Sequence, residues 1–382
     1  MGAEAQAQPH GPVEPLPAVV ETVLPQGAAP PDVTAVPGAG VVNALETALL
    51  QGEASPSALA RLWESTTGWV LLAFLRYYHG LSLAVVGRFF GVHKSTVLRW
   101  LVPLAEVNWQ AVVQRGARAF SGTVAVDEKW LRIGGVWWHL FAAVDHGSGF
   151  PLQVALFPAN TTAYCTLFLL QLKALGYTPT VIITDGWDAY VRAIATVFPQ
   201  AEHLLCRFHA LQAAFRRLRA AVYSWKDRQV WVARLSRLFR TASKRTVRRR
   251  LAKLQAAALG TPVAGVLARL TAKMPKLLPA IGSTFRPSTT NAAERFLGAF
   301  DRFYRCKRPF PDEASARKHL ALFMLGYVFT TFSAEAKAAH QGKCPLQLAG
   351  YPVGTIPLFH LLNRPNLAVL RQRLVAQYAP AI

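Results

Sequence analysis

The order of strand-like and helix-like segments between residues 121 and 209 constrains the fold more than any other feature of the chain. Three apolar runs rich in β-branched and aromatic residues come first, and glycines precede the second and third of them. A helical segment, a short buried strand that stops at Asp185, a second helical segment and a last strand then follow. This alternation predicts an α/β domain that opens with a three-stranded meander.

Three strands, a helix, a strand, a helix and a strand is the element order of a ribonuclease-H-like fold, in which the first and fourth strands lie side by side. Asp127 is expected to end the first strand and Asp185 to end the fourth, so their carboxylates would emerge at the same level. Two carboxylates that lie so near each other repel unless a cation lies between them. Mg²⁺ and Mn²⁺ prefer such hard oxygen ligands. Glu294, one turn into a predicted helix, is the best third acid for a two-metal site.

Each acid also has a purely structural interpretation. An Asp before a Gly at a strand end is commonly a turn residue, so the ordered set of three acids carries the hypothesis rather than any one of them. Glu128 is expected to point to the face opposite Asp127 and to be solvated. Asp145 is attributed to a hairpin turn, and Asp301 lies on the same helix face as Glu294, where it would support that residue.

The charge of the chain points to a polyanionic partner. Lys and Arg total 42 against 20 acids, which gives a net charge of +22, and neutralised phosphates release counterions on binding. Residues 215–280 hold 17 Lys and Arg and one acid, Asp227. This segment is predicted to be a helical insertion, about 212–285, that contacts nucleic-acid backbone through residues such as Arg248, Arg249 and Arg250. The alternative is a merely solvated basic face.

Two further classes of protein are disfavoured. No apolar run approaches the roughly 20 residues that a membrane span needs, and neither an amphipathic anchor nor a lipidation signal is found, so no membrane partner is expected. The four cysteines are scattered without CxxC pairs, which is typical of reduced thiols in a cytosolic protein and argues against a structural zinc site.

A helix-turn-helix pattern precedes the strands. Residues 82–90 form one predicted helix, Gly91 lies in a tight turn, and residues 94–101 form a second helix. An ordinary helical hairpin with a solvated basic face is the alternative. As a DNA-binding element, the second helix would offer the major groove its polar residues His93, Lys94, Ser95, Thr96 and Arg99.

Composition divides the chain into four predicted parts. The first is rich in Ala and Pro and holds no Lys or Arg, which is typical of disorder. The parts are a disordered tail (1–56), an α-helical helix-turn-helix domain (57–118), an α/β ribonuclease-H-like catalytic core that carries the all-α insertion (119–335), and a C-terminal extension (336–382).

Several motifs resemble the DDE transposases of bacterial insertion sequences: "VDEKW", "ITDGWDAY", "FPQAEHLLCRFHALQ" and "STTNAAERFLGAFDRFYR". Cys206 and His209 look like the CxxH signature of the Mutator-like group, whose members also carry a helical insertion. The 108 residues between Asp185 and Glu294 fit such an insertion. The resemblance covers roughly residues 80–362, and Cys344 departs from the Thr or Arg that is usual in the family tail.

The resemblance implies a chemistry and a set of partners. Asp127, Asp185 and Glu294 would hold two Mg²⁺ (or Mn²⁺) ions. A water would attack a phosphodiester at the transposon end, and the freed 3′ hydroxyl would attack target DNA, without a covalent protein–DNA intermediate. The partners would be double-stranded DNA, as transposon ends and target, and further copies of the chain in a homodimer or larger assembly on DNA. The location would be the bacterial cytoplasm, at the nucleoid.

The resemblance also assigns supporting roles. Cys206 and His209 would order the strand end beside the site, since as a zinc site they lack two ligands. Asn291 and Arg295 flank Glu294, and one of them would contact phosphate or brace the loop. Two rival functions remain: a transposase-derived DNA-binding protein without catalysis, and a ribonuclease-H-like nuclease without strand transfer. Retention of all three acids disfavours the first, and the helix-turn-helix pattern disfavours the second.

Overall fold

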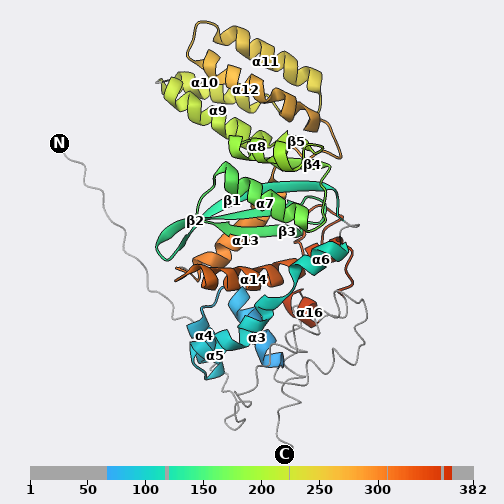
Figure 1. Cartoon of the computed structure of the whole chain (residues 1–382). Helices are drawn as coiled ribbons and strands as arrows, with labels where there is room; N and C mark the ends of the chain where they lie inside the picture. The colour runs from blue at the N-terminus through green and yellow to red at the C-terminus, as the bar shows by residue number, and fades with distance from the viewer. Residues whose placement is uncertain (1–66, 117–119, 223, 308, 354–356, 364–382) are drawn as a thin grey trace, which may run out of the picture.

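The structure is a computed structural model that describes residues 67–116, 120–222, 224–307, 309–353 and 357–363. The predicted tail (1–56) and the end of the C-terminal extension lie outside these residues. The described chain is a mixed α/β protein with three layers along its length (Figure 1). Helices α9 to α12 lie at one end, a five-stranded sheet with its covering helices lies in the middle, and helices α3 to α5 lie at the other end.

The sheet has the strand order β3-β2-β1-β4-β5. Strands β1, β2 and β3 form an antiparallel meander, and β4 and β5 run parallel to β1. The predicted adjacency of the first and fourth strands is therefore confirmed. The bounds are β1 (Thr123–Ile133), β2 (Val136–Asp145), β3 (Pro151–Phe157), β4 (Val181–Thr184) and β5 (Glu202–Leu205).

The first strand is longer than the sequence pattern suggested. Asp127 does not end β1, which continues to Ile133. The second half of β1 remains a strand because it pairs with β2 in a hairpin, although β4 has already stopped at Thr184. Similarly, the last predicted strand stops at Leu205, and the "CRFH" segment opens a helix instead.

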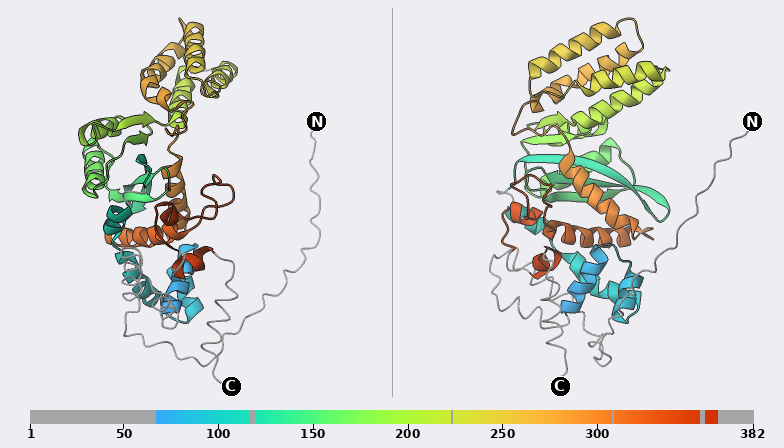
Figure 2. Two further views of the ribbon diagram at one scale, coloured as in Figure 1. Left: turned by 90° about the vertical axis from the view of Figure 1, so that its right-hand side faces the viewer. Right: turned by 180° about the vertical axis from the view of Figure 1, so that it is seen from behind.

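Helices cover both faces of the sheet (Figure 2). On one face lie α7 (Thr162–Ala174) and α8 (Asp188–Val197), whose Phe168 and Tyr190 pack on Phe141 of β2. On the other lies α13 (Asn291–Arg305), with α14 (Glu313–Phe329) beneath it. Helix α13 forms because its buried residues recur at helical spacing and give one apolar stripe: Phe296, Leu297, Phe300, Phe303 and Tyr304.

The strongly basic segment is helical, as predicted, and it has its own core. Buried leucines and valines of the four helices form a cluster separate from the core of the sheet, including Leu218, Leu251 and Leu267. Their many arginines are consequently left on the surface of this layer. The helices are α9 (Arg207–Ala221), α10 (Trp225–Ser236), α11 (Lys244–Ala258) and α12 (Val263–Leu277), followed by the short η2 (Leu278–Ala280).

Two short helices occupy the positions that the sequence predicted before the sheet. Helix α4 begins after Ser82, whose side chain accepts a hydrogen bond from the Val85 backbone N–H, and it ends at Gly91 in the left-handed conformation. A Cβ at Gly87 would lie 2.5 Å from the Val92 carbonyl oxygen, so only glycine permits this close turn. The helices here are α3 (Thr67–Tyr78), α4 (Leu83–Phe90), α5 (Lys94–Leu101), η1 (Val102–Glu106) and α6 (Trp109–Gly116).

The chain after α14 returns toward the N-terminal helices. Asn363 accepts a hydrogen bond from the Thr331 backbone N–H and donates one to the Phe329 carbonyl, so this end is fastened to the end of α14. The two short helices here are α15 (Pro345–Leu348) and α16 (Pro357–Asn363). Among the described residues, no helix has both the length and the apolar character needed to cross a bilayer.

Candidate functional site

Asp127 lies in β1, and Asp185 directly follows the adjacent parallel strand β4, at the same level. Val124 pairs with Ile182 and Ala125 with Ile183, so continuing this register by two residues sets Asp127 beside Asp185. Oδ1 of Asp127 accepts a hydrogen bond from the Glu128 backbone N–H at 2.9 Å, and Oδ1 of Asp185 accepts one from the Trp187 N–H at 2.9 Å. Within the described chain these bonds leave Oδ2 of each aspartate available to a ligand.

The electrostatics of this position favour a cation. Burial, and then the neighbouring charge of Glu128, raise the pKa of Asp127 to about 7, with Asp185 adding to the rise. The nearby His209 and the hydrogen bond from the Glu128 N–H act in the opposite direction. Burial and the neighbouring carboxylates therefore both disfavour an isolated charge on Asp127.

The expectation that Glu128 is solvated is wrong. Its carboxylate accepts hydrogen bonds from the Tyr190 hydroxyl and from the Asn160 amide. Glu128 does face away from Asp127, but α8 covers that face of the sheet and brings Tyr190 onto it. Burial raises the pKa of Glu128, and the two hydrogen bonds partly offset this rise.

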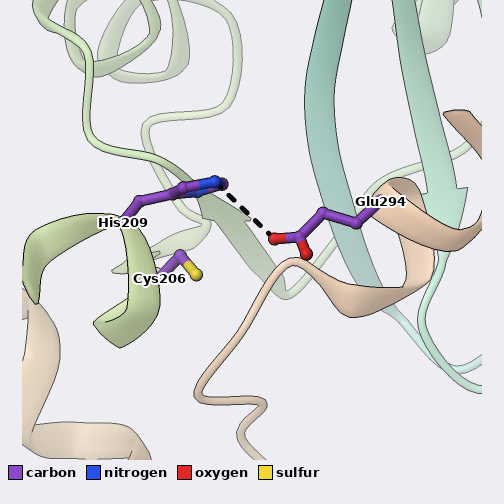
Figure 3. Close-up of side chains that lie close together, drawn as sticks. All are labelled: Cys206, His209 and Glu294. Carbon is purple, nitrogen blue, oxygen red and sulfur yellow. Dashed lines mark ion pairs between the residues drawn. The ribbon is translucent and has the colours of Figure 1, made fainter. Parts of the chain in front are cut away.

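Glu294 lies in the first turn of α13, as predicted. Its Oε1 accepts a hydrogen bond of 2.6 Å from the hydroxyl of Thr290, which is fully buried, and lies 3.7 Å from Nε2 of His209 (Figure 3). The glutamate therefore faces the start of α9, where the CxxH motif lies.

The CxxH motif joins the end of the sheet to the start of the basic helices. Cys206 is the N-cap residue of α9, and its backbone N–H donates to the Thr184 carbonyl at the end of β4. Hydrogen bonding with Cys206 raises the pKa of His209 to about 9. Burial acts to raise the pKa of Cys206, but hydrogen bonds with His209 and Thr290 outweigh it and lower that pKa. This pairing favours a thiolate beside an imidazolium.

The three predicted acids do not form one compact ligand group. In the described residues, the donor atoms that lie within 4.8 Å of one another belong to Cys206, His209 and Glu294. The charges of Asp127 and Glu294 both raise the pKa of His209, so His209 lies near both acids. The sheet thus brings Asp127 and Asp185 together, while Glu294 faces the histidine.

Asn291 and Arg295 have different surroundings. Asn291 lines a cavity of about 880 Å³ between α9, the α10–α11 connection and the loop before α13. Arg207, Arg240 and Glu294 line the same cavity. The Arg295 guanidinium instead lies over the Phe332 ring, 5.2 Å from its centroid, so it braces the segment after α14.

The basic residues proposed for DNA also differ in their surroundings. Arg248 and Arg249 are exposed on α11. Arg250 is partly buried and donates to the carbonyls of Arg237 and Arg240, at 2.6 and 3.2 Å, so it fastens the α10–α11 connection.

The polar face of α5 is accessible. His93 accepts a hydrogen bond from the Ser95 N–H and caps the helix, while the Arg99 guanidinium donates to the Thr96 hydroxyl. Of the five predicted residues Thr96 is partly buried, and the exposed ones are His93, Lys94, Ser95 and Arg99.

Sequence reasoning missed three residues around the site. Thr290 binds Glu294, Tyr190 binds Glu128, and the Lys273 ammonium lies 3.5 Å from the Gly186 carbonyl next to Asp185. Lys273 comes from α12, so the basic helices reach the acid pair. The only signals available were a hydroxyl directly before the "NAAE" turn and a lysine on the apolar-faced α12, and neither is specific.

The fold and the site together define a class: mixed α/β proteins with carboxylates on adjacent parallel strands and a separate basic helical layer. The family described as "Transposase, Mutator family" matches residues 152–327. The chain is 30% identical over 127 residues to the transposase for insertion sequence element IS257 in transposon Tn4003 of Staphylococcus aureus. It is 28% identical over the same length to the transposase for insertion sequence-like element IS431mec of S. aureus.

Each of these matches covers 32% of this chain and 56% of the relative, so the chain spans about half the length of the curated relatives it matches. These similarities support the resemblance to insertion-sequence transposases that the motifs predict.

Proposed function

We propose that the chain binds transposon ends and cleaves and joins DNA through Asp127, Asp185 and Glu294 with two divalent metal ions. The observation that carries the proposal is the pairing register that sets Asp127 beside Asp185. The names of the relatives support transposition as the process. The proposed division is a helix-turn-helix domain (57–118), a catalytic core (119–335) and a C-terminal extension (336–382).

The sheet order supports a ribonuclease-H-like core. A meander of three antiparallel strands is followed by two strands that continue parallel to the first, with α7 and α8 as the crossovers. The basic helices α9 to α12 interrupt the core between β5 and α13, at the place where the predicted insertion falls.

The acids fit a pair of hard divalent cations. Asp127 and Asp185 each have one oxygen engaged in a hydrogen bond. Burial and neighbouring carboxylates raise the pKa of Asp127, and a bound dication would stabilise its charged form. Glu294 completes the set by turning from His209 toward the aspartates. When bound, two Mg²⁺ or Mn²⁺ ions would supply Lewis-acid activation of the attacking oxygen and stabilisation of the leaving one.

The side chains around the acids would position the reacting strand. Glu128 and Tyr190 hold β1 against α8, and Lys273 offers a cation beside Asp185 for a phosphate oxygen. A water first opens the phosphodiester at the transposon end, leaving a 3′ hydroxyl and a 5′ phosphate. The 3′ hydroxyl then forms one new phosphodiester in target DNA as one P–O bond of that strand breaks.

Double-stranded DNA is the proposed partner at two surfaces. The exposed residues of α5 would enter the major groove as the second helix of a helix-turn-helix, and the basic face of α9 to α12 would contact phosphates. Two ends must be brought together in transposition, so a dimer or larger assembly on DNA, located at the nucleoid in the bacterial cytoplasm, is proposed.

The decisive experiment compares Asp185→Asn with Asp188→Asn. Asp188 is an exposed residue at the start of α8, so its variant makes the same chemical change three residues away. With labelled DNA carrying the element's ends and Mg²⁺, Asp185→Asn is expected to lose cleavage and strand transfer but retain DNA binding. Full activity of Asp185→Asn would refute the proposed centre. If the wild type cleaves no DNA with any divalent metal ion, a DNA-binding function would be favoured instead.

A further inference from the structure

A second donor group lies beside the proposed acid centre. Cys206 and His209 are three residues apart at the start of α9 and so share one helix face, and Glu294 approaches them from α13 (Figure 3). One donor atom of each residue lies within 4.8 Å of the others. Two elements separated by the whole basic insertion thus bring a thiol, an imidazole and a carboxylate together.

This donor set differs in chemical kind from the aspartate pair. Oxygen ligands alone suit Mg²⁺ and Mn²⁺, whereas sulfur and imidazole nitrogen favour zinc-like transition metals. Three protein ligands with one open position is a common arrangement for bound zinc. The sequence alone offered two ligands, and the fold supplies Glu294 as the third.

The surroundings favour metal binding over a merely packed cysteine. Cys206 is fully buried at a helix N-terminus, where the backbone N–H groups stabilise a thiolate. His209 presents Nε2 to Glu294, 3.7 Å from its Oε1. Thr290, fully buried, holds the Glu294 carboxylate toward the other two side chains.

We propose that Cys206, His209 and Glu294 bind one zinc-like transition-metal ion, and that this ion holds Glu294 away from Asp127 and Asp185. The first half is independent of the transposase chemistry. The second half rests on the proposed function, because it makes zinc an inhibitor of the magnesium-dependent reaction by sharing one ligand with it.

Zinc binding by the full-length, chelator-treated protein tests the first half. Isothermal titration with Zn²⁺, and the absorption bands that a cobalt–thiolate bond gives with Co²⁺, are expected to show one ion per chain. Loss of an outer-shell partner weakens metal binding by about 10- to 100-fold, so Cys206→Ser and His209→Asn, which remove direct ligands, should weaken it by at least about 100-fold.

The controls separate this site from other thiols and acids. Cys306→Ser alters an exposed free thiol elsewhere, and Asp185→Asn alters the acid pair, so both are expected to bind zinc like the wild type. Absence of zinc binding by the wild type, or wild-type affinity in Cys206→Ser, would overturn the site. Loss of binding in Asp185→Asn would assign the ion to the aspartates.

Cleavage assays at fixed Mg²⁺ test the second half. For each protein the ratio of the rate with zinc to the rate without it is compared, so a lower basal rate in a variant does not matter. The wild type is expected to be inhibited and to recover as Mg²⁺ is increased, and Cys206→Ser to be inhibited at least about 10-fold less at equal zinc. Equal inhibition of both proteins would contradict the shared ligand. A chain that cleaves no DNA would refute the proposed function while leaving the binding result standing.

Discussion

Nε2 of His209 lies 3.7 Å from Oε1 of Glu294, so the glutamate of the proposed triad is held by a side chain outside that triad. The aspartates are fixed by the backbone, since each accepts a hydrogen bond from an N–H one or two residues along the chain. Glu294 is instead fixed by the Thr290 and His209 side chains. The centre therefore consists of a rigid pair on the sheet and a third acid whose direction depends on neighbouring groups.

The Thr290 hydroxyl is expected to matter for the position of Glu294. Thr290→Val keeps the shape of a fully buried side chain but removes the 2.6 Å hydrogen bond to the carboxylate. A hydrogen bond to a charged group contributes about 1.5–3 kcal/mol, so zinc binding by the Cys206, His209 and Glu294 group should weaken by at least about tenfold. Thr289→Val, one residue earlier in the same loop, is the control. Unchanged zinc affinity in Thr290→Val, measured by isothermal titration, would show that Glu294 needs no such support.

The metal-free protein should lose stability as pH rises. Burial and Glu128 raise the pKa of Asp127 from 3.8 to about 7, so its stabilising contribution is full below the unfolded pKa and is lost as pH rises through the folded one. Asp127→Asn removes this dependence. Melting temperatures measured without metal should fall less steeply in Asp127→Asn than in the wild type between about pH 4 and about pH 7. If the melting temperatures of the two proteins fell equally with pH, Asp127 would not be a buried carboxyl group with a raised pKa.

The order of elements was predictable because apolar periodicity and β-branched runs are local signals. They gave the adjacency of β1 and β4, and with it the Asp127–Asp185 pair. The continuation of β1 past Asp127 was not predictable, because it depends on hairpin pairing with β2 beyond the end of β4. The burial of Glu128 likewise depends on Tyr190 reaching it from α8, and the single sequence carries no sign of that contact.

Asp145 is expected to be a structural residue of the sheet. It is fully buried and accepts hydrogen bonds from the backbone N–H and the hydroxyl of both Ser121 and Ser148, at 2.6–2.8 Å. Asp145→Ala removes the acceptor of four hydrogen bonds, two of them from the buried Ser148, so the free energy of unfolding should fall by about 3 kcal/mol or more. Denaturant titration checks this value. Asp145→Asn, which keeps one acceptor, should lose less, and a loss below about 1 kcal/mol in Asp145→Ala would show that water replaces the bonds.

The salt dependence of DNA binding should separate Arg248 and Arg249 from Arg250. The first two are exposed on α11, whereas Arg250 is bonded to the Arg237 and Arg240 carbonyls. The slope of log K against log salt changes by about 0.9 for each phosphate contact. The double variant Arg248→Gln, Arg249→Gln should therefore flatten the slope by about 1 to 2 at unchanged melting temperature.

Arg250→Gln makes the same kind of charge change but removes the bonds that fasten the α10–α11 connection. It should lower the melting temperature and leave the slope nearly unchanged, since its guanidinium is already engaged by protein carbonyls. Arg317→Gln, on α14 and ion-paired with Glu313, is the control for loss of a positive charge away from the basic helices. If the salt-dependence slope of the double variant equals that of Arg317→Gln, Arg248 and Arg249 are only solvated. The phosphate contacts would then have to lie elsewhere on the protein.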